Sequence, residues 1–518
     1  MSDPVDLLFI HVPRFTSYYR PYGEYMTVNL IPMGTFALAD LALRRGYRTE
    51  ILHLGLEWIE TGAFSPLKYL EKNNVQVVAI SLNWHQQSYD VMRVAGQIKR
   101  ERPGTYIVLG GCTASFFHEE ILENFPQIDG VIRGDAEVPL MALMAAVKQE
   151  KDLQKIPNLS WRVGKEIRNN PLSYVASGDD LDSASYANLN LLKGKDTYIR
   201  YMGLPLVWAK GLSREVNRKY FHLGHPLFFL NIGRGCLGNC TWCGGGEEAQ
   251  RIANGRSGVV FRRLDRVVDT VAEAVESGYK AIHIAFDPGK EGVRYYRELF
   301  PLLKGFKVRC YFESFSLPSE AFLKEFSETF VQDGSVIAIS PETGDERVRY
   351  RNKSFSFSNE ALMKTISLAE RLGIKVDIFF SMGIPGEKYR DLAKTCSLRG
   401  EIKKRFKNIG RMWTAPIALE PASPWHLHPE EFGIVSTRRS FADFYQASSP
   451  GGGGMGYYIP DYLGDGRALD AEEFEMLLKR TKCRDHCSLH INPSKASSPF
   501  WGRMSCRYLN WRVGGGHG

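Results

Sequence analysis

Residues 231–250 read NIGRGCLGNCTWCGGGEEAQ and place three cysteines, Cys236, Cys240 and Cys243, within eight positions. A zinc site usually takes four Cys or His ligands, so this loop would need a distant histidine to complete one. A cubane [4Fe–4S] cluster has four irons, and three thiolates would hold it while one iron stays open to a substrate. The loop is polar and glycine-rich, which disfavours the alternative of three cysteines packed in a core. We therefore expect an iron–sulfur cluster here.

A regular alternation of strands and helices surrounds this loop. Apolar runs predict strands at 226–233, 280–287, 308–314, 335–342, 375–383 and 411–419. Helical patterns lie between them, as in NEALMKTISLAERLG at 359–373. Six such units predict a partial or full (β/α)6 barrel, whose site lies at the carboxyl ends of the strands. The cysteine loop follows the first strand and so falls at that end.

The N-terminal part of the chain alternates in the same way. Strands are predicted at 5–12, 49–55, 75–83, 105–111 and 129–135, with helices between them. Continuous apolar strands that alternate with helices predict an α/β, doubly wound, Rossmann-like parallel sheet. Ligands of such sheets bind beyond the carboxyl ends of the strands. Residues 158–170 alternate and turn at Gly-Lys, which predicts a β-hairpin, and 171–225 indicate an irregular linker with short helices.

Length and composition set wider bounds. The 518 residues predict two or three domains, for which we expect the boundaries 1–150, 151–225, 226–434 and an irregular C-terminal region at 435–518. The net charge of +8 is spread along the chain, which disfavours nucleic-acid binding. No apolar run is long enough to span a membrane, and the first residues lack a secretory signal pattern, so we expect a cytoplasmic protein. In that reducing compartment, clustered cysteines indicate metal ligands.

The barrel with its cysteine loop resembles the radical S-adenosylmethionine (SAM) enzymes. Three further segments carry the resemblance: SPETGDERV at 340–348, MGIPGE at 382–387 and ALEPASPWHLHPEEFGI at 418–434. The resemblance implies a [4Fe–4S] cluster whose open iron binds SAM and cleaves it to a 5′-deoxyadenosyl radical. It assigns SAM binding to Trp242, Gly244, Gly245, Glu342, Thr343, Gly383 and Ile384. It assigns no catalytic residue.

A doubly wound domain followed by a hairpin and such a barrel resembles the radical SAM enzymes that carry a cobalamin-binding domain. VLGGCTAS at 108–115 and IDGVIRGDAEVPL at 128–140 add to this likeness. It implies cobalamin binding by Ser81, Asn83, Gly110, Gly111, Thr113, Arg133 and Gly134. The loop VPRFTSYYRPYGEYM at 12–26 lacks the Asp-x-His-x-x-Gly motif, so we expect base-off cobalamin without a protein ligand. We expect His85 to form hydrogen bonds rather than to ligate cobalt. A domain that binds substrate or no corrin stays an alternative.

Together these resemblances imply methyl transfer from cobalamin to an unreactive carbon of a small-molecule or lipid substrate. An external donor such as flavodoxin or ferredoxin would supply electrons. The alternatives are non-methylating radical chemistry, such as cyclisation, ring contraction or C–C coupling, and a non-catalytic corrinoid or iron–sulfur protein. Cys483, Cys487 and Cys506 form a second group near the C-terminus, which predicts either a second metal site or local packing.

Overall fold

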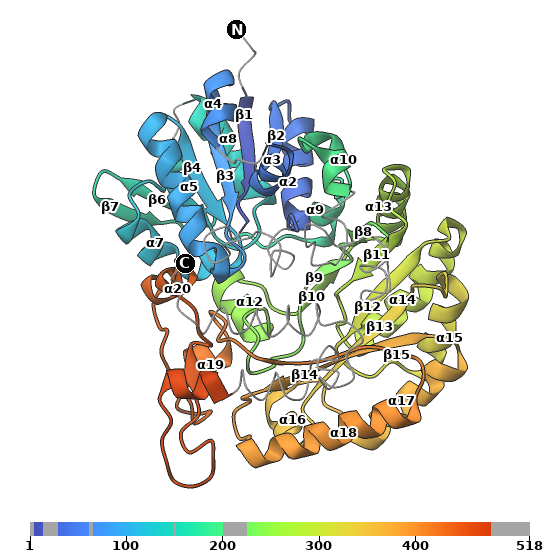
Figure 1. The fold of residues 1–518 in the computed structure, drawn as a ribbon. Coiled ribbons are helices and arrows are strands. Elements are labelled where there is room, and N and C mark those ends of the chain that lie inside the picture. Colours follow the sequence, from blue (N-terminus) through green and yellow to red (C-terminus); the bar gives the residue numbers. More distant parts are fainter. Residues whose placement is uncertain (1–4, 14–29, 62–65, 150–151, 200–224, 478–518) are drawn as a thin grey trace.

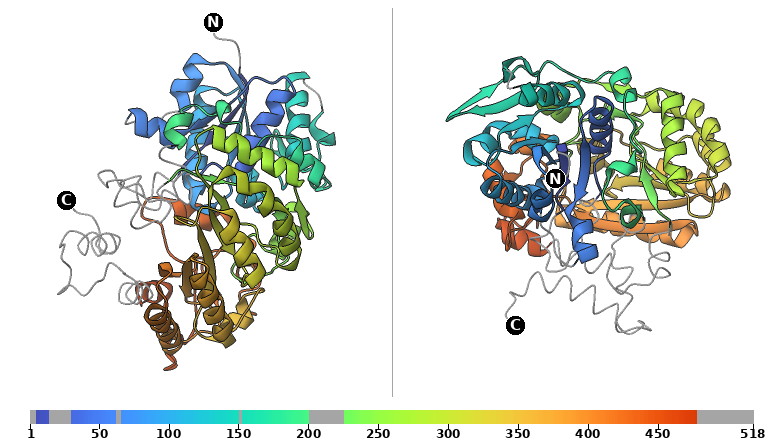
Figure 2. Two further views of the ribbon diagram at one scale, coloured as in Figure 1. Left: turned by 90° about the vertical axis from the view of Figure 1, so that its right-hand side faces the viewer. Right: turned by 90° about the horizontal axis from the view of Figure 1, so that it is seen from above.

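The computed structural model describes residues 5–13, 30–61, 66–149, 152–199 and 225–477. Within these ranges the chain forms a seven-stranded sheet, a six-stranded sheet and two small two-stranded sheets. The seven-stranded sheet lies above the six-stranded one in Figure 1 and in the left view of Figure 2. None of the helices in these ranges is long and apolar enough to cross a membrane.

The N-terminal sheet has the strand order β2-β1-β3-β4-β5-β6-β7. Its strands are β1 (Val5–His11), β2 (Thr49–His53), β3 (Val75–Ser81), β4 (Tyr106–Gly110), β5 (Gly130–Ile132), β6 (Leu159–Val163) and β7 (Glu166–Asn169). The first five run parallel, and β6 and β7 form an antiparallel hairpin that extends the same sheet. The predicted doubly wound sheet and hairpin are therefore confirmed.

Helices cover both faces of this sheet. They are α2 (Met33–Arg44), α3 (Leu54–Thr61), α4 (Pro66–Lys72), α5 (Ser88–Glu101), α6 (Cys112–Phe116), α7 (His118–Asn124) and α8 (Glu137–Gln149), with the single turns η1 (His85–Gln87) and η2 (Leu153–Lys155). Leu7 and Phe9 of β1 pack in one core with α2 and α8, while Leu8 and Ile10 pack in a second core with α4, α5 and α7. Burial on both faces explains the continuous apolar run of this strand.

The second sheet has the order β15-β14-β13-β12-β11-β8, with all neighbours parallel. Its strands are β8 (Leu227–Phe229), β11 (Ala281–Ile284), β12 (Arg309–Ser314), β13 (Val336–Glu342), β14 (Lys375–Met382) and β15 (Ile409–Pro416). Among the described residues β8 and β15 are the edge strands of this sheet. The sheet is curved but does not close, and it therefore forms a partial barrel (Figure 1). The predicted partial (β/α)6 barrel is confirmed, although β8 is shorter than expected.

The helices of this part of the chain mostly cover the outer side of the barrel, except α12 (Glu247–Asn254), which lies against α6 of the N-terminal domain (Figure 1). The others are α13 (Leu264–Glu276), α14 (Lys290–Leu303), α15 (Glu320–Thr329), α16 (Glu346–Asn352), α17 (Asn359–Arg371) and α18 (Leu392–Arg405), with the turns η5 (Lys304–Phe306) and η6 (Tyr389–Asp391). Before the barrel, the linker holds α9 (Gly178–Asp182), η3 (Leu189–Leu191) and α10 (Lys195–Thr197). After the barrel come α19 (Pro424–Leu427), β16 (Val435–Ser436), α20 (Phe441–Ser448) and β17 (Tyr457–Tyr458).

This C-terminal segment packs back on the N-terminal domain. Phe441 and Phe444 of α20 share a core with Val91 of α5 and Phe117, which follows α6. Leu419 and Tyr457 belong to the same core and extend it to Ile384 in the loop after β14. The segment therefore joins the carboxyl edge of the N-terminal sheet to the carboxyl edge of the barrel.

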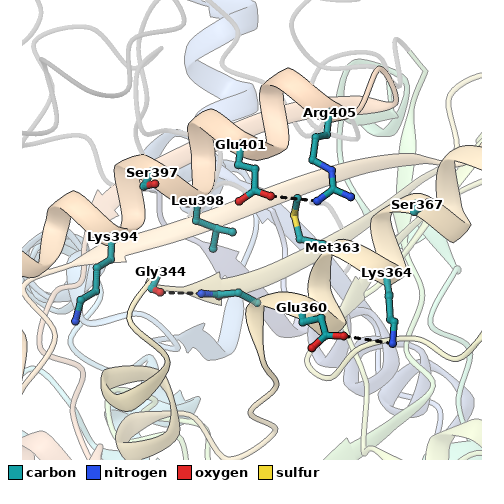
Figure 3. A pocket seen from close by; sticks show the side chains of 11 residues that line it. Gly344, Glu360, Met363, Lys364, Ser367, Lys394, Ser397, Leu398, Glu401 and Arg405 are labelled. Carbon is teal, nitrogen blue, oxygen red and sulfur yellow. Dashed lines mark hydrogen bonds and ion pairs between the residues drawn. The ribbon is translucent and has the colours of Figure 1, made fainter.

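A hollow lies on the outer side of the barrel, between α17 and α18 (Figure 3). Glu360 and Lys364 form an ion pair along α17, and Glu401 and Arg405 form another along α18. The lining comes almost entirely from helix surfaces, so this hollow does not belong to the strand-end site.

Candidate cluster and cofactor site

Two short strands that the sequence did not predict hold the cysteine loop. β9 (Gly233–Gly235) and β10 (Val259–Phe261) pair antiparallel on either side of it. Gly233 and Gly235 allow this close approach, because an added Cβ would lie 2.1 Å from the carbonyl oxygen of Val260 or of Gly258, respectively. Gly235 also has a φ of +97°, which favours glycine. The pair therefore fixes the point at which the loop leaves the barrel.

Each of the three thiols faces a backbone amide. The donor–acceptor pairs are Gly238 N–H to Cys236 Sγ (3.3 Å), Ser354 N–H to Cys240 Sγ (3.5 Å) and Gly245 N–H to Cys243 Sγ (3.3 Å). Amide hydrogen bonds stabilise the thiolate form and tune iron–sulfur centres. The donor set thus fits a cluster held by three thiolates.

Burial acts in the opposite direction on these thiols. It raises the pKa of Cys243 to about 12 and also raises the pKa of Cys236, and negative charge on the neighbouring thiols adds to both shifts. Cys236 and Cys243 therefore keep their protons until a metal centre replaces them. In the described part of the chain, no three His, Cys, Asp or Glu side chains are grouped as a single metal ion would require.

The loop is held against the strand ends by contacts around Thr241. Its hydroxyl donates to Asn352 Oδ1 (2.8 Å), and its carbonyl accepts from the amide of Trp425 (3.0 Å). Trp242 lies with its ring centroid 6.2 Å from that of Trp425. A Cβ at Gly244 would lie 2.4 Å from the Pro421 carbonyl oxygen, so only glycine fits there.

The predicted SAM-binding residues of β13 and β14 meet at the same edge. Glu342 has a φ of +64°, and its buried carboxylate accepts a hydrogen bond from Ser381. Burial raises the pKa of Glu342. Such strained backbone is often found at functional sites. The hydroxyl of Thr343, by contrast, is fully buried and lies 3.3 Å from that of Thr395, away from the strand end.

A buried carboxylate that was not predicted from the sequence holds the backbone of the loop after β14 in place. Glu387 is fully buried and accepts hydrogen bonds from the amide of Gly383 (2.7 Å) and the hydroxyl of Tyr462 (3.0 Å). Burial raises the pKa of Glu387 to about 7. Tyr457 donates to the Gly383 carbonyl (2.6 Å), and Ile384 packs beneath the loop. The only sequence signal was the glutamate that closes MGIPGE.

Five of the predicted cobalamin-binding residues gather where β3 and β4 end. Ser81 and Gly110 are register partners. The Asn83 side chain accepts from the amide of Cys112 (3.2 Å), and its carbonyl accepts from the hydroxyl of Thr113 (2.9 Å). Gly111 has a φ of +100°, and a Cβ there would lie 2.5 Å from Asn83 Oδ1. This edge lies beside the switch point of the sheet between β1 and β3, where ligands of doubly wound sheets bind.

The other two, Arg133 and Gly134, lie at the end of β5. The Arg133 guanidinium donates to the carbonyl of Asn158 (3.3 Å) and to that of Asn170, so it ties β5 to the hairpin. A Cβ at Gly134 would lie 2.9 Å from Cα of Asn254, at the end of α12. These residues therefore contact protein rather than an open strand end.

One buried carboxylate ties the cysteine loop to the N-terminal domain. Asp135, which is 8% exposed, accepts from Arg234 (2.7 Å) and from Arg256. Arg234 lies on β9 just before the cysteines, and Arg256 follows α12 just after them. Glu137 accepts a further bond from Arg234 (2.5 Å). Burial opposes ionisation, but the two arginines bring the pKa of Asp135 below its ordinary value.

His85 is packed rather than open to a ligand. It is 4% exposed, and its ring lies 4.9 Å from that of Phe444. Its Nε2 lies 3.7 Å from Oε1 of Glu420, in the loop after β15. The second cysteine group, Cys483, Cys487 and Cys506, lies outside the described residues, as does most of the loop after β1.

Comparison with known proteins agrees with this architecture. Residues 20–144 match the B12 binding domain, and residues 230–398 match the radical SAM superfamily. The chain therefore belongs to the radical SAM enzymes that carry a B12 binding domain.

Curated relatives are distant. The uncharacterized methyltransferase PH0819 of Pyrococcus horikoshii is 25% identical over 49% of this chain and 48% of its own length. The uncharacterized protein MJ0966 of Methanocaldococcus jannaschii is 25% identical over 74% of both chains. The match thus spans about half of the first relative and three quarters of the second.

Among solved structures, the radical SAM methyltransferase TsrM of Kitasatospora setae, with cobalamin and a [4Fe–4S] cluster bound, has a TM-score of 0.66 at 14% identity and covers 99% of both chains. The cobalamin-dependent radical SAM enzyme OxsB, with aqua-cobalamin and SAM bound, has a TM-score of 0.64 at 13% identity over 98% of this chain and 71% of its own. At these identities the likeness describes the fold.

Proposed function

We propose that this protein is a cobalamin-dependent methyltransferase that acts on an unreactive carbon through a 5′-deoxyadenosyl radical. The observation that carries the proposal is the placement of the three-cysteine loop. Its thiols each face an amide donor at the carboxyl edge of the barrel, and Asp135 ties both ends of the loop to the B12-type domain. When bound, the cluster supplies the electron that cleaves SAM, and cobalamin supplies the methyl group.

The chain's own residues then bind and orient these groups. Cys236, Cys240 and Cys243 would hold three irons and leave the fourth for SAM. Glu342, held by Ser381, would accept a hydrogen bond from the cofactor at the barrel edge. Gly383 and the loop that Glu387 braces would lie beside the adenine, with Trp242 on the side of the cysteine loop.

The N-terminal edge would take the corrin. Gly110 and Gly111 leave room for the nucleotide tail beside Asn83 and Thr113. The packing of His85 against Phe444 supports base-off binding without that imidazole on cobalt. We propose residues 1–150 and 226–434 as the two cofactor-binding domains, and an external donor such as flavodoxin or ferredoxin as the source of electrons.

The experiment that tests methyl transfer needs no knowledge of the substrate. The full chain is purified without oxygen, supplied with cobalamin, iron and sulfide, reduced, and mixed with SAM. A methyltransferase forms S-adenosylhomocysteine, about one per bound cobalamin, when the corrin takes up a methyl group. Protein that retains corrin and forms 5′-deoxyadenosine but no S-adenosylhomocysteine would refute methyl transfer and favour non-methylating radical chemistry.

A further inference from the structure

The inner face of the barrel has two layers of different character. Inward side chains alternate with outward ones along each strand, because successive residues of a strand point to opposite faces. The lower layer is an apolar cluster formed by Leu227, Ala281, Val336, Ala338 and Tyr311. The upper layer, nearer the cysteine loop, holds charged and aromatic side chains.

A cation of this interior, Arg411 on β15, is already paired. Its Nε donates to Asp377 Oδ2 (2.6 Å), and its guanidinium donates to the hydroxyl of Tyr311 (2.8 Å). Asp377 is fully buried, so both charges are compensated within the protein. Arg411 is therefore poorly placed to receive an anionic ligand.

Glu313 on β12 differs from this pair. It lies one residue before the end of the strand, and its side chain is 39% exposed. Oε1 is bound to Nε2 of His283 on β11 (2.8 Å). Within the described residues, no hydrogen bond occupies Oε2 of Glu313. The barrel thus presents one carboxylate oxygen to its interior.

His283 supports this carboxylate from behind. The His283 side chain is 9% exposed, and its ring lies 4.4 Å from that of Phe229 and 5.0 Å from that of Tyr311. Burial alone would raise the pKa of Glu313, but the facing histidine lowers it below its ordinary value. Glu313 therefore carries negative charge into a space with aromatic walls.

The aromatic walls favour the same kind of ligand. Trp413 on β15 is 47% exposed, and its ring packs edge-on against Phe379 at 5.8 Å. Aromatic faces attract cations, and the Arg411 guanidinium already lies over the rings of Tyr311 (5.3 Å), Phe379 (5.7 Å) and Trp413 (5.9 Å). The partly exposed carboxylate of Glu313 would therefore supply most of the attraction for a ligand cation. An anionic ligand would meet repulsion from Glu313.

We propose that the barrel interior binds a substrate with a cationic nitrogen, an alkyl ammonium group, held by Glu313 against the aromatic walls. Oε2 of Glu313 accepts from the ammonium, and His283 is a positioning residue that keeps Oε1 in place. This inference rests on the proposed function, since it names the substrate class of the same site.

The test uses ligands that differ only in charge. The full chain loaded with cobalamin, iron and sulfide is titrated calorimetrically with phenethylammonium, phenethyl alcohol and 3-phenylpropionate. We expect the cation to bind most tightly, the alcohol at least about tenfold more weakly, and the anion not measurably. The order of the three affinities is measured on the parent protein, so it tests the proposal even if a substitution at Glu313 disturbs folding.

The variant Glu313→Gln should lose about tenfold in affinity for phenethylammonium and little for the alcohol. The matched control is Glu298→Gln, on the outer side of α14, which should bind all three ligands as the parent does. Equal binding of cation and anion by the parent, or unchanged cation binding by Glu313→Gln, would overturn the proposal. S-adenosylhomocysteine formation, measured on the same samples without substrate, reports on the proposed function separately.

Discussion

Replacement of Asp135 by asparagine should loosen the contact between the cysteine loop and the B12-type domain. Asp135 is 8% exposed and holds Arg256, which is 5% exposed, and Arg234, which is 21% exposed. Removing one partner of a buried ion pair costs about 3–5 kcal/mol, because the remaining charge is left without compensation. We expect about 3 kcal/mol here, since Glu137 still pairs with Arg234 and the Ala176 carbonyl still accepts from Arg256.

Two measurements check this prediction. Urea denaturation should show the loss in the free energy of unfolding, whereas Asp265→Asn, which removes an exposed pair with Arg263, should leave the free energy of unfolding close to that of the parent. Pulsed electron paramagnetic resonance should show a broader distance distribution between cob(II)alamin and the reduced cluster in Asp135→Asn. Unchanged stability together with an unchanged distance distribution would refute this role for Asp135.

The other predictions concern the cysteines, one glycine and one buried carboxyl group. Cys236→Ala, Cys240→Ala and Cys243→Ala should each lose most bound iron and all 5′-deoxyadenosine formation, as measured by iron analysis and chromatography. Gly235→Ala should lose iron and stability, because its Cβ would lie 2.1 Å from the Gly258 carbonyl oxygen at a φ of +97°. The pKa of Glu387 is raised from 4.5 to about 7, so its carboxyl contributes stability that falls as pH rises between these values, by at most about 3 kcal/mol. The difference in stability between the parent and Glu387→Gln should change by that amount in urea titrations over the same range.

Each of these predictions has a matched control. Cys396→Ala, on α18, should keep iron and radical formation, and an equal loss there would point to general unfolding. Gly305→Ala meets no atom within 4 Å and has no positive φ, so it should match the parent. The same pH dependence of stability in the parent and in Glu387→Gln between pH 4.5 and 7 would contradict the raised pKa of Glu387.

Most parallel strands of the two large sheets were predictable because they are apolar runs that the sheet buries, whereas the β6–β7 hairpin was predictable from its alternation and its Gly-Lys turn. The β9–β10 pair was not, since Gly-Arg-Gly carries no strand preference and forms a strand only through close backbone approach. The cysteine loop could be found from spacing alone. Its tie to the N-terminal domain could not, because Asp135, Arg234 and Arg256 meet only in the folded chain.

The roles of acidic residues were the hardest part of the site to predict. Glutamate usually lies on the surface, so the sequence gives no sign of a structural role for Glu387 or Glu313. Only the structure shows that Glu387 accepts a hydrogen bond from Gly383 and that Glu313 is bound to His283. Arg133 stays a predicted cobalamin-binding residue, and the sequence did not indicate that its guanidinium also donates to the hairpin. Local sequence does not determine which neighbour a long side chain reaches.

The most direct test of the account is to purify the protein without oxygen, with cobalamin supplied, and to measure corrin, iron and the cluster spectrum together. We expect about one cobalamin and at least about four irons per chain, with a cluster electron paramagnetic resonance signal that shifts when SAM is added. A protein that retains no corrin, or a cluster signal that SAM leaves unchanged, would contradict the account.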